Sequence, residues 1–509
     1  MPGLIRSGTR TLTQATLADH VARAARGFTD LGVRPGDAVA LMLRNDLAFF
    51  EARFAVGSLG AYSVPVNWHY TGEELAYILT DSDARALVIH ADLLARVAGD
   101  LPADLPVLVV ATPPEIAVAY AVDPDLCAVP AGRTDWDAWV TGFAPWDGAP
   151  VEPPAAVIYT SGTTGRPKGV RRHPADPETS RRTLAMFEKV LGITGQARTT
   201  ITGPLYHSAP HAYGDLMARA GAEISLMPRF DPEGLLARIQ NERLTHLYMV
   251  PTMFVRLLKL PEGVRKLYDV SSLRDVVHAA APCPPHIKRG MIDWWGPVIN
   301  EFYGSTETSA VVYCTAPEWL AHPGTVGRVL PEAIVTIQDD DGNTLPTGAI
   351  GEVFCRQKAV TDFTYHKDDE KRRSVERDGL VTSGDVGYLD EDGFLYLCDR
   401  KKDMVISGGV NIYPAEIEAA LHAMPGVHDC AVFGIPDDEY GEALAAVIQP
   451  QPGANLTEQA VRAFVRSRLA GYKVPRVIEF HASLPREDSG KIFKRRLREP
   501  WWANAGRAI

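Results

Sequence analysis

Hydrophobic positions in the first half of the chain follow a helical spacing and then a strand spacing, repeatedly. The first helical set recurs every three or four residues: Leu17, Val21, Ala24, Phe28 and Leu31. The apolar run 38–43 that follows predicts a buried strand. A second unit begins at Thr71-Gly-Glu-Glu74, which has the form of a helix capping box, and ends in the apolar run 86–89. The pattern indicates helices that lead into strands.

The same alternation continues toward the middle of the chain. Helices are predicted over residues 232–243 and 286–295, and strands follow them over 247–250 and 298–302. Repeated alternation of this kind is typical of mainly parallel sheets covered by helices, so the predicted fold class is α/β. The stretch 112–154 is rich in Pro, Ala, Gly and Asp with weak periodicity, and it predicts a connecting region.

A charged turn, Asp399-Arg-Lys-Lys-Asp403, separates this part of the chain from a new set of elements. The new elements are two predicted helices and two predicted strands: 414–422, 457–469, 430–435 and 443–448. The chain is therefore predicted to form a large domain over residues 1–399 and a small α+β domain over residues 400–509.

Composition narrows the choice of partners and location. The 509 residues include 63 Asp and Glu against 52 Lys and Arg, and the formal charge of −11 disfavours binding to nucleic acid or anionic lipid. The six cysteines form no C-x-x-C pair, which favours reduced thiols in the cytoplasm. No uncharged apolar run reaches the roughly 20 residues of a membrane span. The sequence is compatible with a monomer and with a homodimer.

A loop rich in glycine and hydroxyl side chains follows a predicted strand over residues 155–159. Its sequence is Thr160-Ser-Gly-Thr-Thr-Gly-Arg-Pro-Lys-Gly169. Glycines let backbone N–H groups close on phosphate oxygens, hydroxyls donate further hydrogen bonds, and a lysine offsets phosphate charge. The loop is not a Walker A loop, because G-x-x-x-x-G-K-S/T is absent. The predicted contacts to ATP phosphates are Thr160, Ser161, Gly162, Thr163, Thr164, Gly165 and Lys168.

This ten-residue string resembles the signature of the adenylate-forming superfamily, which contains acyl-CoA synthetases, firefly-type luciferases and the adenylation domains of nonribosomal peptide synthetases. Further family motifs occur in the expected order, so the resemblance covers nearly the whole chain. Phe302-Tyr-Gly-Ser-Thr-Glu307 is similar to the family's Y-G-x-T-E motif. The resemblance implies that Tyr303 packs on adenine, with Gly304 also in the ATP site. It further implies that Thr306 contacts the α-phosphate and that Glu307 helps hold Mg²⁺.

The adenine-binding segment implied by the resemblance includes Ala280, Ala281 and Pro282. Here Ala279 and Ala280 stand where the family usually has glycines. Because a glycine lets the backbone approach a ligand most closely, the approach to adenine is expected to be altered in this chain.

Two motifs before and within the charged turn complete the nucleotide site by resemblance. Thr382-Ser-Gly-Asp385 is similar to the family's aspartate motif, in which the carboxylate accepts hydrogen bonds from both ribose hydroxyls. Arg400 is expected to contact ribose or phosphate. Lys402 matches the hinge about which the small domain rotates in this family, so the resemblance implies that the small domain is mobile.

The C-terminal part contributes two further motifs. Pro485-Arg-Glu-Asp-Ser-Gly-Lys491 resembles the motif whose lysine enters the active site for adenylation, where an ammonium stabilises developing charge. Ser407-Gly-Gly-Val-Asn411 resembles the segment whose glycines, Gly408 and Gly409 here, line the tunnel for coenzyme A after rotation. The resemblance implies two half-reactions: ATP and a carboxylic acid give an acyl-adenylate and pyrophosphate, and coenzyme A then releases AMP.

The expected acyl pocket lies at Pro204-Leu-Tyr-His207-Ser-Ala209, which is similar to the segment that borders the acid and the thiol entrance in acyl-CoA synthetases. His207 corresponds to a gate in that segment. Tyr206, His207 and Ser208 supply no aspartate for a substrate ammonium, which disfavours an amino acid. A small side chain at Ala209 favours a longer or bulkier acid, and fatty, aryl and polycyclic acids all stay open.

Two other functions are weighed against an acyl-CoA synthetase. An adenylating enzyme that passes its acyl group to a separate carrier protein, or to another acceptor, is the main alternative. A non-catalytic binding relative would be expected to have lost Glu307 or Lys491, and both residues are present.

Overall fold

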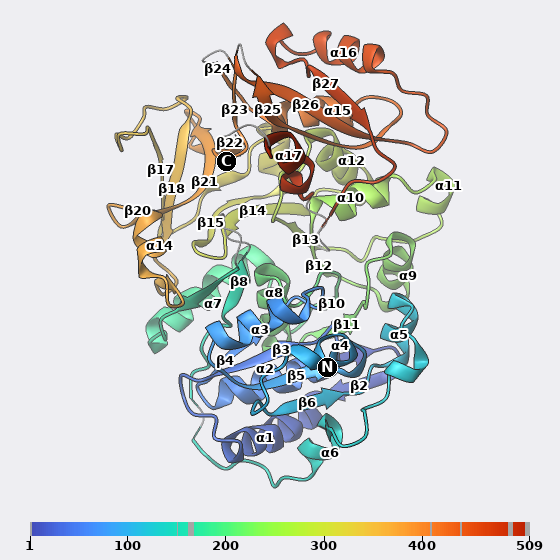
Figure 1. Ribbon diagram of the computed structural model, residues 1–509, viewed down its shortest axis with the longest axis vertical. Helices are drawn as coiled ribbons and strands as arrows, with labels where there is room; N and C mark the ends of the chain where they lie inside the picture. The colour runs from blue at the N-terminus through green and yellow to red at the C-terminus, as the bar shows by residue number, and fades with distance from the viewer. Residues whose placement is uncertain are drawn as a thin grey trace.

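A computed structural model describes residues 3–149, 151–160, 167–407, 410–437, 440–486 and 492–503. Figure 1 shows the N-terminal elements gathered at one end of the molecule and the C-terminal elements at the other. All six cysteines are free thiols, as predicted. Among the residues that the structure describes, no helix has the length and apolar character needed to cross a membrane.

The N-terminal part contains a five-stranded sheet in which all strands are parallel, in the order β4-β3-β5-β6-β7. Its strands are β3 (Ala38–Met42), β4 (Tyr62–Pro65), β5 (Ala84–His90), β6 (Val107–Val110) and β7 (Thr134–Asp135). The first helices around it are α1 (Gln14–Asp30), α2 (Leu47–Ser58), α3 (Gly72–Asp81) and α4 (Ala91–Val97). Alternate residues of β3 join two different apolar clusters, Val39 and Leu41 in one and Ala40 and Met42 in the other. Both faces of this sheet are therefore covered, which explains its continuous hydrophobic strands.

The predicted capping box at the start of α3 is confirmed. The Thr71 hydroxyl accepts a hydrogen bond from the Glu74 backbone N–H at 3.4 Å, and the Glu74 carboxylate accepts one from the Thr71 N–H at 2.7 Å. These two reciprocal bonds satisfy backbone donors that the first helical turn leaves without an intrahelical partner.

The prediction of a connecting region over residues 112–154 is wrong in part, because regular elements lie within it. They are α5 (Pro114–Tyr120), the 3₁₀ turn η2 (Pro124–Leu126), β7 and α6 (Trp136–Thr141). Trp136 is fully buried, its ring centroid lies 6.1 Å from that of Phe28, and its indole N–H donates to Glu51 at 2.9 Å. Such tertiary contacts stabilise a short helix whose own sequence carries little periodicity.

The largest sheet has 14 described strands in the order β17-β18-β21-β22-β16-β15-β14-β13-β12-β10-β11-β1-β2, with β20 beside β21. Its first strands are β1 (Leu4–Ser7), β2 (Arg10–Thr13), β10 (Arg198–Ile201), β11 (Glu223–Leu226), β12 (His246–Met249), β13 (Asp275–His278) and β14 (Ile299–Ser305). The remaining strands are β15 (Ser309–Cys314), β16 (Gly327–Val329), β17 (Ala333–Gln338), β18 (Gly351–Gln357), β20 (Glu376–Arg377), β21 (Leu380–Leu389) and β22 (Phe394–Arg400). The associated helices are α7 (Pro177–Leu191), α8 (Ser208–Ala220), α9 (Pro232–Glu242), α10 (Pro251–Leu258), α11 (Glu262–Arg265), α12 (Pro285–Trp295), α13 (Ala316–Ala321) and α14 (Asp369–Ser374).

The α/β class is confirmed, and this large sheet is mixed. Strands β1, β11, β10, β12, β13 and β14 pair in parallel, whereas every pairing from β14 to β17 is antiparallel. The change has a simple cause, because β12, β13 and β14 are joined through helices, whereas β14 and β15 are joined by a tight turn over residues 306–308. Short turns connect antiparallel strands, and parallel strands need a crossover.

The C-terminal part has its own five-stranded sheet in the order β24-β23-β26-β25, with β27 pairing β26. Its elements are β23 (Val405–Ser407), β24 (Val410–Ile412), α15 (Pro414–His422), β25 (Val427–Asp437), β26 (Gly441–Pro450), α16 (Glu458–Arg466), the 3₁₀ turn η3 (Gly471–Lys473), β27 (Val477–Phe480) and α17 (Lys494–Trp502). The two helices and two strands predicted here are confirmed. β22 ends at Arg400, and the turn 401–403 leads into this separate sheet. The division at residue 399 stays a prediction.

Candidate active site

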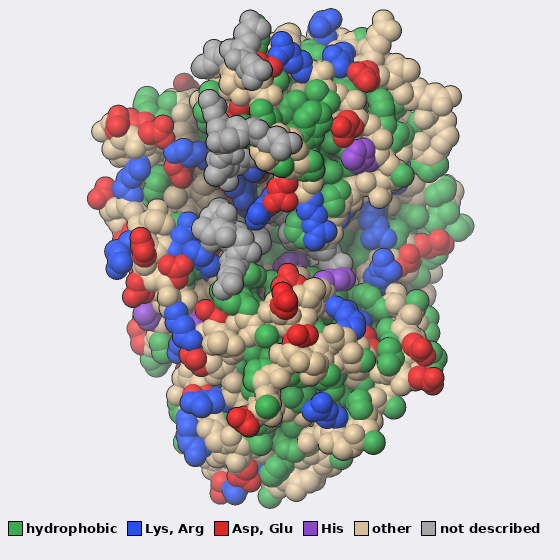
Figure 2. All heavy atoms as spheres, viewed as in Figure 1, with side chains coloured by type: hydrophobic (Ala, Val, Ile, Leu, Met, Phe, Trp, Pro, Cys, Tyr) green, Lys and Arg blue, Asp and Glu red, His purple; other side chains and the backbone are tan. Residues whose placement is uncertain are grey.

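A cleft of about 3700 Å³ lies between the large sheet and the C-terminal elements. Figure 2 shows it as a hollow across the middle of one face, with basic and acidic side chains around it. Residues at the carboxyl ends of β12, β13 and β14 line one wall, and residues of α15 and α17 line another. The carboxyl edge of parallel strands is where open α/β sheets bind ligands.

The predicted phosphate loop is held at both of its ends. β8 (Ile158–Thr160) pairs antiparallel with β9 (Lys168–Arg172), and Thr160 lies opposite Lys168. β19 (Phe363–Tyr365) pairs with the other side of β9, which makes a three-stranded sheet. Thr160 and Lys168 both line the cleft. The remaining predicted loop contacts lie outside the described residues: Ser161, Gly162, Thr163, Thr164 and Gly165.

Lys168 has a carboxylate partner in this structure. Its ammonium donates to Asp368 Oδ2 at 2.7 Å, a contact between residues 200 positions apart in the sequence. This hydrogen bond is the main cause that lowers the pKa of Asp368. A phosphate group that binds Lys168 therefore has to share the ammonium with Asp368 or displace it.

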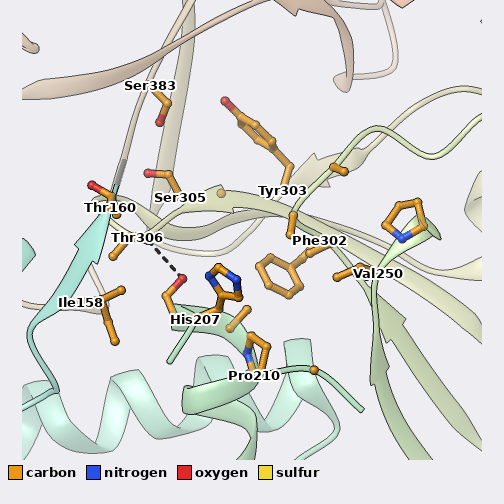
Figure 3. A pocket seen from close by; sticks show the side chains of 18 of the residues that line it. Ile158, Thr160, His207, Pro210, Val250, Phe302, Tyr303, Ser305, Thr306 and Ser383 are labelled. Carbon is orange, nitrogen blue, oxygen red and sulfur yellow. Dashed lines mark hydrogen bonds between the residues drawn. The ribbon is translucent and has the colours of Figure 1, made fainter. Parts of the chain in front are cut away.

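The turn after β14 carries the predicted contacts to the α-phosphate and to Mg²⁺. Gly304 permits a close approach, because a Cβ at this position would lie 1.9 Å from the Ser309 carbonyl oxygen. The Thr306 hydroxyl donates to Ser208 Oγ at 3.1 Å, which links this turn to the start of α8 (Figure 3). The Glu307 carboxylate accepts a hydrogen bond from the Tyr365 hydroxyl at 3.0 Å.

Arg172 of β9 fixes the backbone of the same turn. Its guanidinium donates to the carbonyl oxygens of Thr306 and Glu307, at 3.0 and 2.8 Å. The strand that follows the phosphate loop is thereby bonded to the turn that carries the proposed α-phosphate contact. The Arg172 side chain therefore connects the two parts of the predicted phosphate site.

The residues expected to bind adenosine meet at one corner of the cleft. The Tyr303 hydroxyl donates to Asp385 Oδ2 at 2.8 Å, and Arg400 Nε lies 3.4 Å from Asp385 Oδ1. Asp385 and Arg400 are directly opposite each other in the β21–β22 ladder. Burial and the neighbouring Asp385 charge raise the pKa of Tyr303 well above its usual value, so its hydroxyl stays protonated and donates.

The predicted adenine-binding segment lies between β13 and α12. All four residues 279–282 line the cleft, and Ala279 is the buried one among them, at 4% exposed. Ala280 has φ of +76°, in the left-handed region that favours glycine. The backbone therefore keeps a glycine-like conformation at a position that this chain fills with alanine.

The predicted acyl-pocket residues lie at the N-terminus of α8. Tyr206 is 5% exposed, and its ring centroid lies 4.7 Å from that of Trp68 and 4.3 Å from that of His207. His207 and Ala209 line the cleft. Figure 3 shows that the wall also includes three apolar side chains that were not among the predicted acyl-pocket residues: Pro210, Val250 and Phe302.

Several predicted residues of the C-terminal part lie outside the described residues: Lys491, Gly408 and Gly409. The segment with Lys491 is flanked by an antiparallel bridge between Arg486 and Ile492, both of which line the cleft. The segment with the two glycines is flanked by the paired residues Ser407 and Val410. Lys402 lies in the turn between β22 and β23, where its carbonyl oxygen accepts a hydrogen bond from Arg498 at 3.4 Å.

The site includes supporting residues that none of the sequence motifs predicts. Asp368 and Tyr365 contact Lys168 and Glu307 from positions 200 and 58 residues away. Tyr365 is the last residue of β19, and Asp368 follows that strand. Only the pairing of β19 with β9 could have suggested these two residues, and that pairing is not visible in the sequence. Phe302 carried a usable signal, because it immediately precedes Tyr303 in the motif.

Comparison with known proteins agrees with this geometry. The AMP-binding enzyme family matches residues 2–363, and the AMP-binding enzyme C-terminal domain matches residues 416–491. A feruloyl-CoA synthase of Amycolatopsis sp is 35% identical over 499 residues, which cover 97% of this chain and 95% of that protein. A second relative is a propanoyl:CoA ligase of Rhodococcus jostii (strain RHA1), whose acyl group carries a methyl-dioxo-octahydro-indenyl ring system. It is 33% identical over 512 residues, which cover 97% of this chain and 95% of that protein.

A solved structure shows the same fold over nearly the whole chain. The amide bond synthetase McbA from Marinactinospora thermotolerans matches with a TM-score of 0.84 at 29% identity, over 98% of this chain and 97% of that one. These findings, namely the two family models, the two relatives and the solved structure, all agree with the superfamily that the motifs resemble. The chain therefore belongs to the AMP-binding enzyme family.

Proposed function

We propose that this chain is an AMP-forming acyl-CoA synthetase that activates a carboxylic acid with an aromatic or otherwise bulky apolar body. The observation that carries the proposal is the shared cleft, in which an apolar wall with Phe302 borders the Thr306–Glu307 turn and the Asp385 carboxylate. An acid and a nucleotide held in these two parts of one cleft would be neighbours. Positioning two reactants in this way supplies much of the catalysis of such a step.

In the first half-reaction a carboxylate oxygen bonds to the α-phosphorus of ATP, and the bond to pyrophosphate breaks. The step needs no enzyme nucleophile, so the chain contributes positioning and charge stabilisation. In our proposal Tyr303 packs on adenine, Asp385 accepts hydrogen bonds from the ribose hydroxyls, and Thr306 donates to the α-phosphate. The hydrogen bond between Tyr303 and Asp385 supports this assignment, because it makes the adenine and ribose contacts one unit.

Glu307 is the residue that would hold Mg²⁺, which neutralises phosphate charge when it is bound. The Tyr365 hydroxyl orients the Glu307 carboxylate. Across the described ranges, no group of three or more His, Cys, Asp and Glu side chains converges as a metal site. One carboxylate nevertheless suits Mg²⁺, because this ion usually keeps several waters and takes its other ligands from substrate phosphates.

In the second half-reaction the thiol of coenzyme A bonds to the acyl carbon, and AMP leaves. The feruloyl-CoA synthase and the Rhodococcus CoA ligase, each similar over 97% of this chain, support coenzyme A as the acceptor. Transfer to another acceptor, such as an amine or a carrier protein, is the second candidate. It is favoured by the likeness to an amide bond synthetase over 98% of the chain.

The acid class rests on the shape and chemistry of the pocket wall. Pro210, Val250 and Phe302 present apolar surfaces (Figure 3), and the small Ala209 also lines the cleft. Apolar walls with few polar groups suit a hydrophobic acyl body. The names of the two relatives, one with an aromatic acyl group and one with a fused-ring acyl group, agree with this choice.

The proposal is tested with purified protein, Mg·ATP and a panel of aryl, polycyclic and fatty acids, by following the release of pyrophosphate and AMP with and without coenzyme A. AMP release that depends on coenzyme A, and is fastest with an aryl or polycyclic acid, is the expected result. Pyrophosphate release that does not respond to coenzyme A would favour another acceptor. No reaction with any acid would refute the proposal.

The role proposed for Lys491 has a separate test. Lys491→Ala is expected to slow adenylation by at least about 10²-fold, the usual effect of losing one stabiliser of transition-state charge. Thioester formation from preformed acyl-adenylate is expected to persist, because the small domain would present a different surface in that step. Equal losses in both half-reactions would contradict this division of roles.

A further inference from the structure

Three ionisable side chains are buried together behind the adenine-binding segment, and the proposed reaction uses none of them. Lys288 and His278 are fully buried, and Glu301 is 5% exposed. The Lys288 ammonium donates to Glu301 Oε2 at 2.5 Å, and His278 Nε2 lies 3.5 Å from the same oxygen. A buried ion pair often stabilises a fold no better than apolar residues of the same size would, so stability alone does not account for it.

The three residues come from three elements that surround the nucleotide site. His278 is the last residue of β13, Lys288 lies in the first turn of α12, and Glu301 lies opposite His278 in β14. The stretch 279–284 leaves β13 directly after His278 and enters α12 just before Lys288. Both ends of this stretch are therefore anchored near one carboxylate.

The same carboxylate is connected to the other side of the nucleotide site. Glu301 is followed in β14 by Phe302, which lines the cleft, and by Tyr303, which donates a hydrogen bond to Asp385, the proposed ribose-binding carboxylate. The stretch 279–284 also contains Ala280 at φ of +76°, a left-handed conformation that is strained for a residue with a Cβ. Backbone in such a conformation persists only where the surrounding contacts enforce it.

Aromatic side chains surround the hydrogen-bonded pair of Lys288 and Glu301. Trp319 of α13 lies beside the ammonium, with its ring centroid 5.3 Å from Lys288 Nζ, and Phe254 packs on His278 with centroids 5.2 Å apart. Burial lowers the pKa of His278 well below its usual value, and the Lys288 charge acts in the same direction. Burial raises the pKa of Glu301, and the Lys288 ammonium opposes that rise. His278 is therefore neutral, and the Lys288 ammonium has Glu301 as its hydrogen-bond partner.

We propose that the Lys288–Glu301 pair is a positioning device for the nucleotide, which holds the stretch 279–284 in place against Tyr303 and so sets the affinity for the adenine end of ATP. The inference rests on the proposed function, because it takes Ala280 to Pro282 as contacts of adenine. Neither Lys288 nor Glu301 touches the reacting atoms in this proposal. Their removal should weaken nucleotide binding and leave the binding of acid and coenzyme A nearly unchanged.

The first test is Lys288→Met, which keeps an unbranched stem of similar length and removes the ammonium. The dissociation constant for AMP, measured by isothermal titration calorimetry without acid or coenzyme A, is expected to rise at least tenfold. The KM for ATP should rise in parallel, whereas the KM values for acid and coenzyme A should change less than threefold. A Lys288→Met protein that binds AMP as tightly as the wild type would overturn the inference.

A second variant keeps the test valid if the single change prevents folding, because an isolated buried carboxylate is strongly destabilising. The double variant K288M/E301L removes both charges, and its thermal stability should return toward that of the wild type. Its AMP affinity should stay at least tenfold weaker, because the stretch 279–284 is no longer tied. Recovery of stability and affinity together would mean that the pair acts on folding alone. Glu301→Gln, which keeps an acceptor oxygen for Lys288, should retain AMP affinity within about threefold.

A matched control is the ion pair of Arg44 and Asp92, which is similarly buried and lies in the N-terminal part of the chain. Its two hydrogen bonds measure 2.8 and 2.7 Å, and its side chains are 5% and 6% exposed. The double variant R44M/D92L should leave AMP affinity unchanged, and an equal loss of affinity would overturn the inference. Wild-type protein that binds no AMP would refute the proposed function as well, whereas normal adenylation with unchanged AMP binding in K288M/E301L would refute this inference alone.

Discussion

Ala280→Gly is expected to increase the stability of the protein at a position within the proposed nucleotide site. Ala280 has φ of +76°, and the left-handed conformation costs a residue with a Cβ about 1–2 kcal/mol. Its side chain is exposed in the cleft, so removal of the methyl group loses little packing. Glycine has more conformational freedom in the unfolded chain, and this offsets about 0.5–1 kcal/mol of the stability gained by relieving the left-handed conformation. The free energy of unfolding is therefore expected to rise by about 0.5–1 kcal/mol.

Calorimetry of the ligand-free protein can detect this gain. An unfolding entropy of about 2.1 cal/mol/K per residue amounts to about 1 kcal/mol/K for 509 residues, so Tm should rise by about 0.5–1 °C. Ala121→Gly is a matched control, because Ala121 is exposed, has φ of +50°, caps the C-terminus of α5 and does not itself line the cleft. It should give the same rise, and the double variant should give the sum, since distant sites act independently.

Opposite results at the two positions would refute the reasoning. A lower Tm for Ala280→Gly, together with a higher Tm for Ala121→Gly, would mean that the Ala280 methyl group makes stabilising contacts that outweigh the cost of its left-handed backbone. Because the substitution keeps the backbone conformation, the dissociation constant for AMP should change less than threefold. A larger change would show that the methyl group itself affects how adenine is bound.

Three further predictions concern hydrogen bonding, metal use and pH. Tyr303→Phe removes a hydrogen bond to the charged Asp385, and a bond of this kind contributes about 1.5–3 kcal/mol. The dissociation constant for ATP should therefore rise about tenfold or more. Unchanged ATP binding in titration calorimetry would contradict the proposal that Tyr303 and Asp385 bind adenosine together. Glu307→Gln should raise the Mg²⁺ concentration needed for half-maximal adenylation at least tenfold, and an unaltered Mg²⁺ titration would remove Glu307 from the proposed metal site. Burial lowers the pKa of both His211 and His422 to about 4, whereas an unfolded histidine titrates near 6.5. The unfolded state therefore binds more protons below about pH 6.5, and the contribution of these residues to stability is lost as the pH falls from about 6.5 to 4. Between pH 7 and 5, His211→Gln should lose about 2 kcal/mol less unfolding free energy than the wild type, and equal losses in denaturant titrations would contradict this.

Much of the fold was predictable because its signals are local. The helical spacing from Leu17 to Leu31, the capping box at Thr71 and the elements after residue 403 all depend on residues close together in the sequence, and the structure confirms them. The helix α6 was missed because Trp136 and its neighbours are stabilised by contacts with α1 and α2, which no local pattern reveals. The mixed sheet also depends on tertiary pairing, beyond the alternation of helices and strands.

The kind of chemistry could be inferred from residue order alone, because the motifs around Thr160, Tyr303 and Asp385 are short strings that suit phosphate, adenine and ribose. The residues that support these side chains, in contrast, are brought to them by folding. The partners of Lys168 and Glu307 are Asp368 and Tyr365, which arrive through the pairing of β9 with β19. The pairing of Lys288 with Glu301 likewise needs β13, α12 and β14 to be folded together. A motif gives functional groups in chain order, but distances between groups far apart in the sequence are fixed only when the strands and helices that carry them pack.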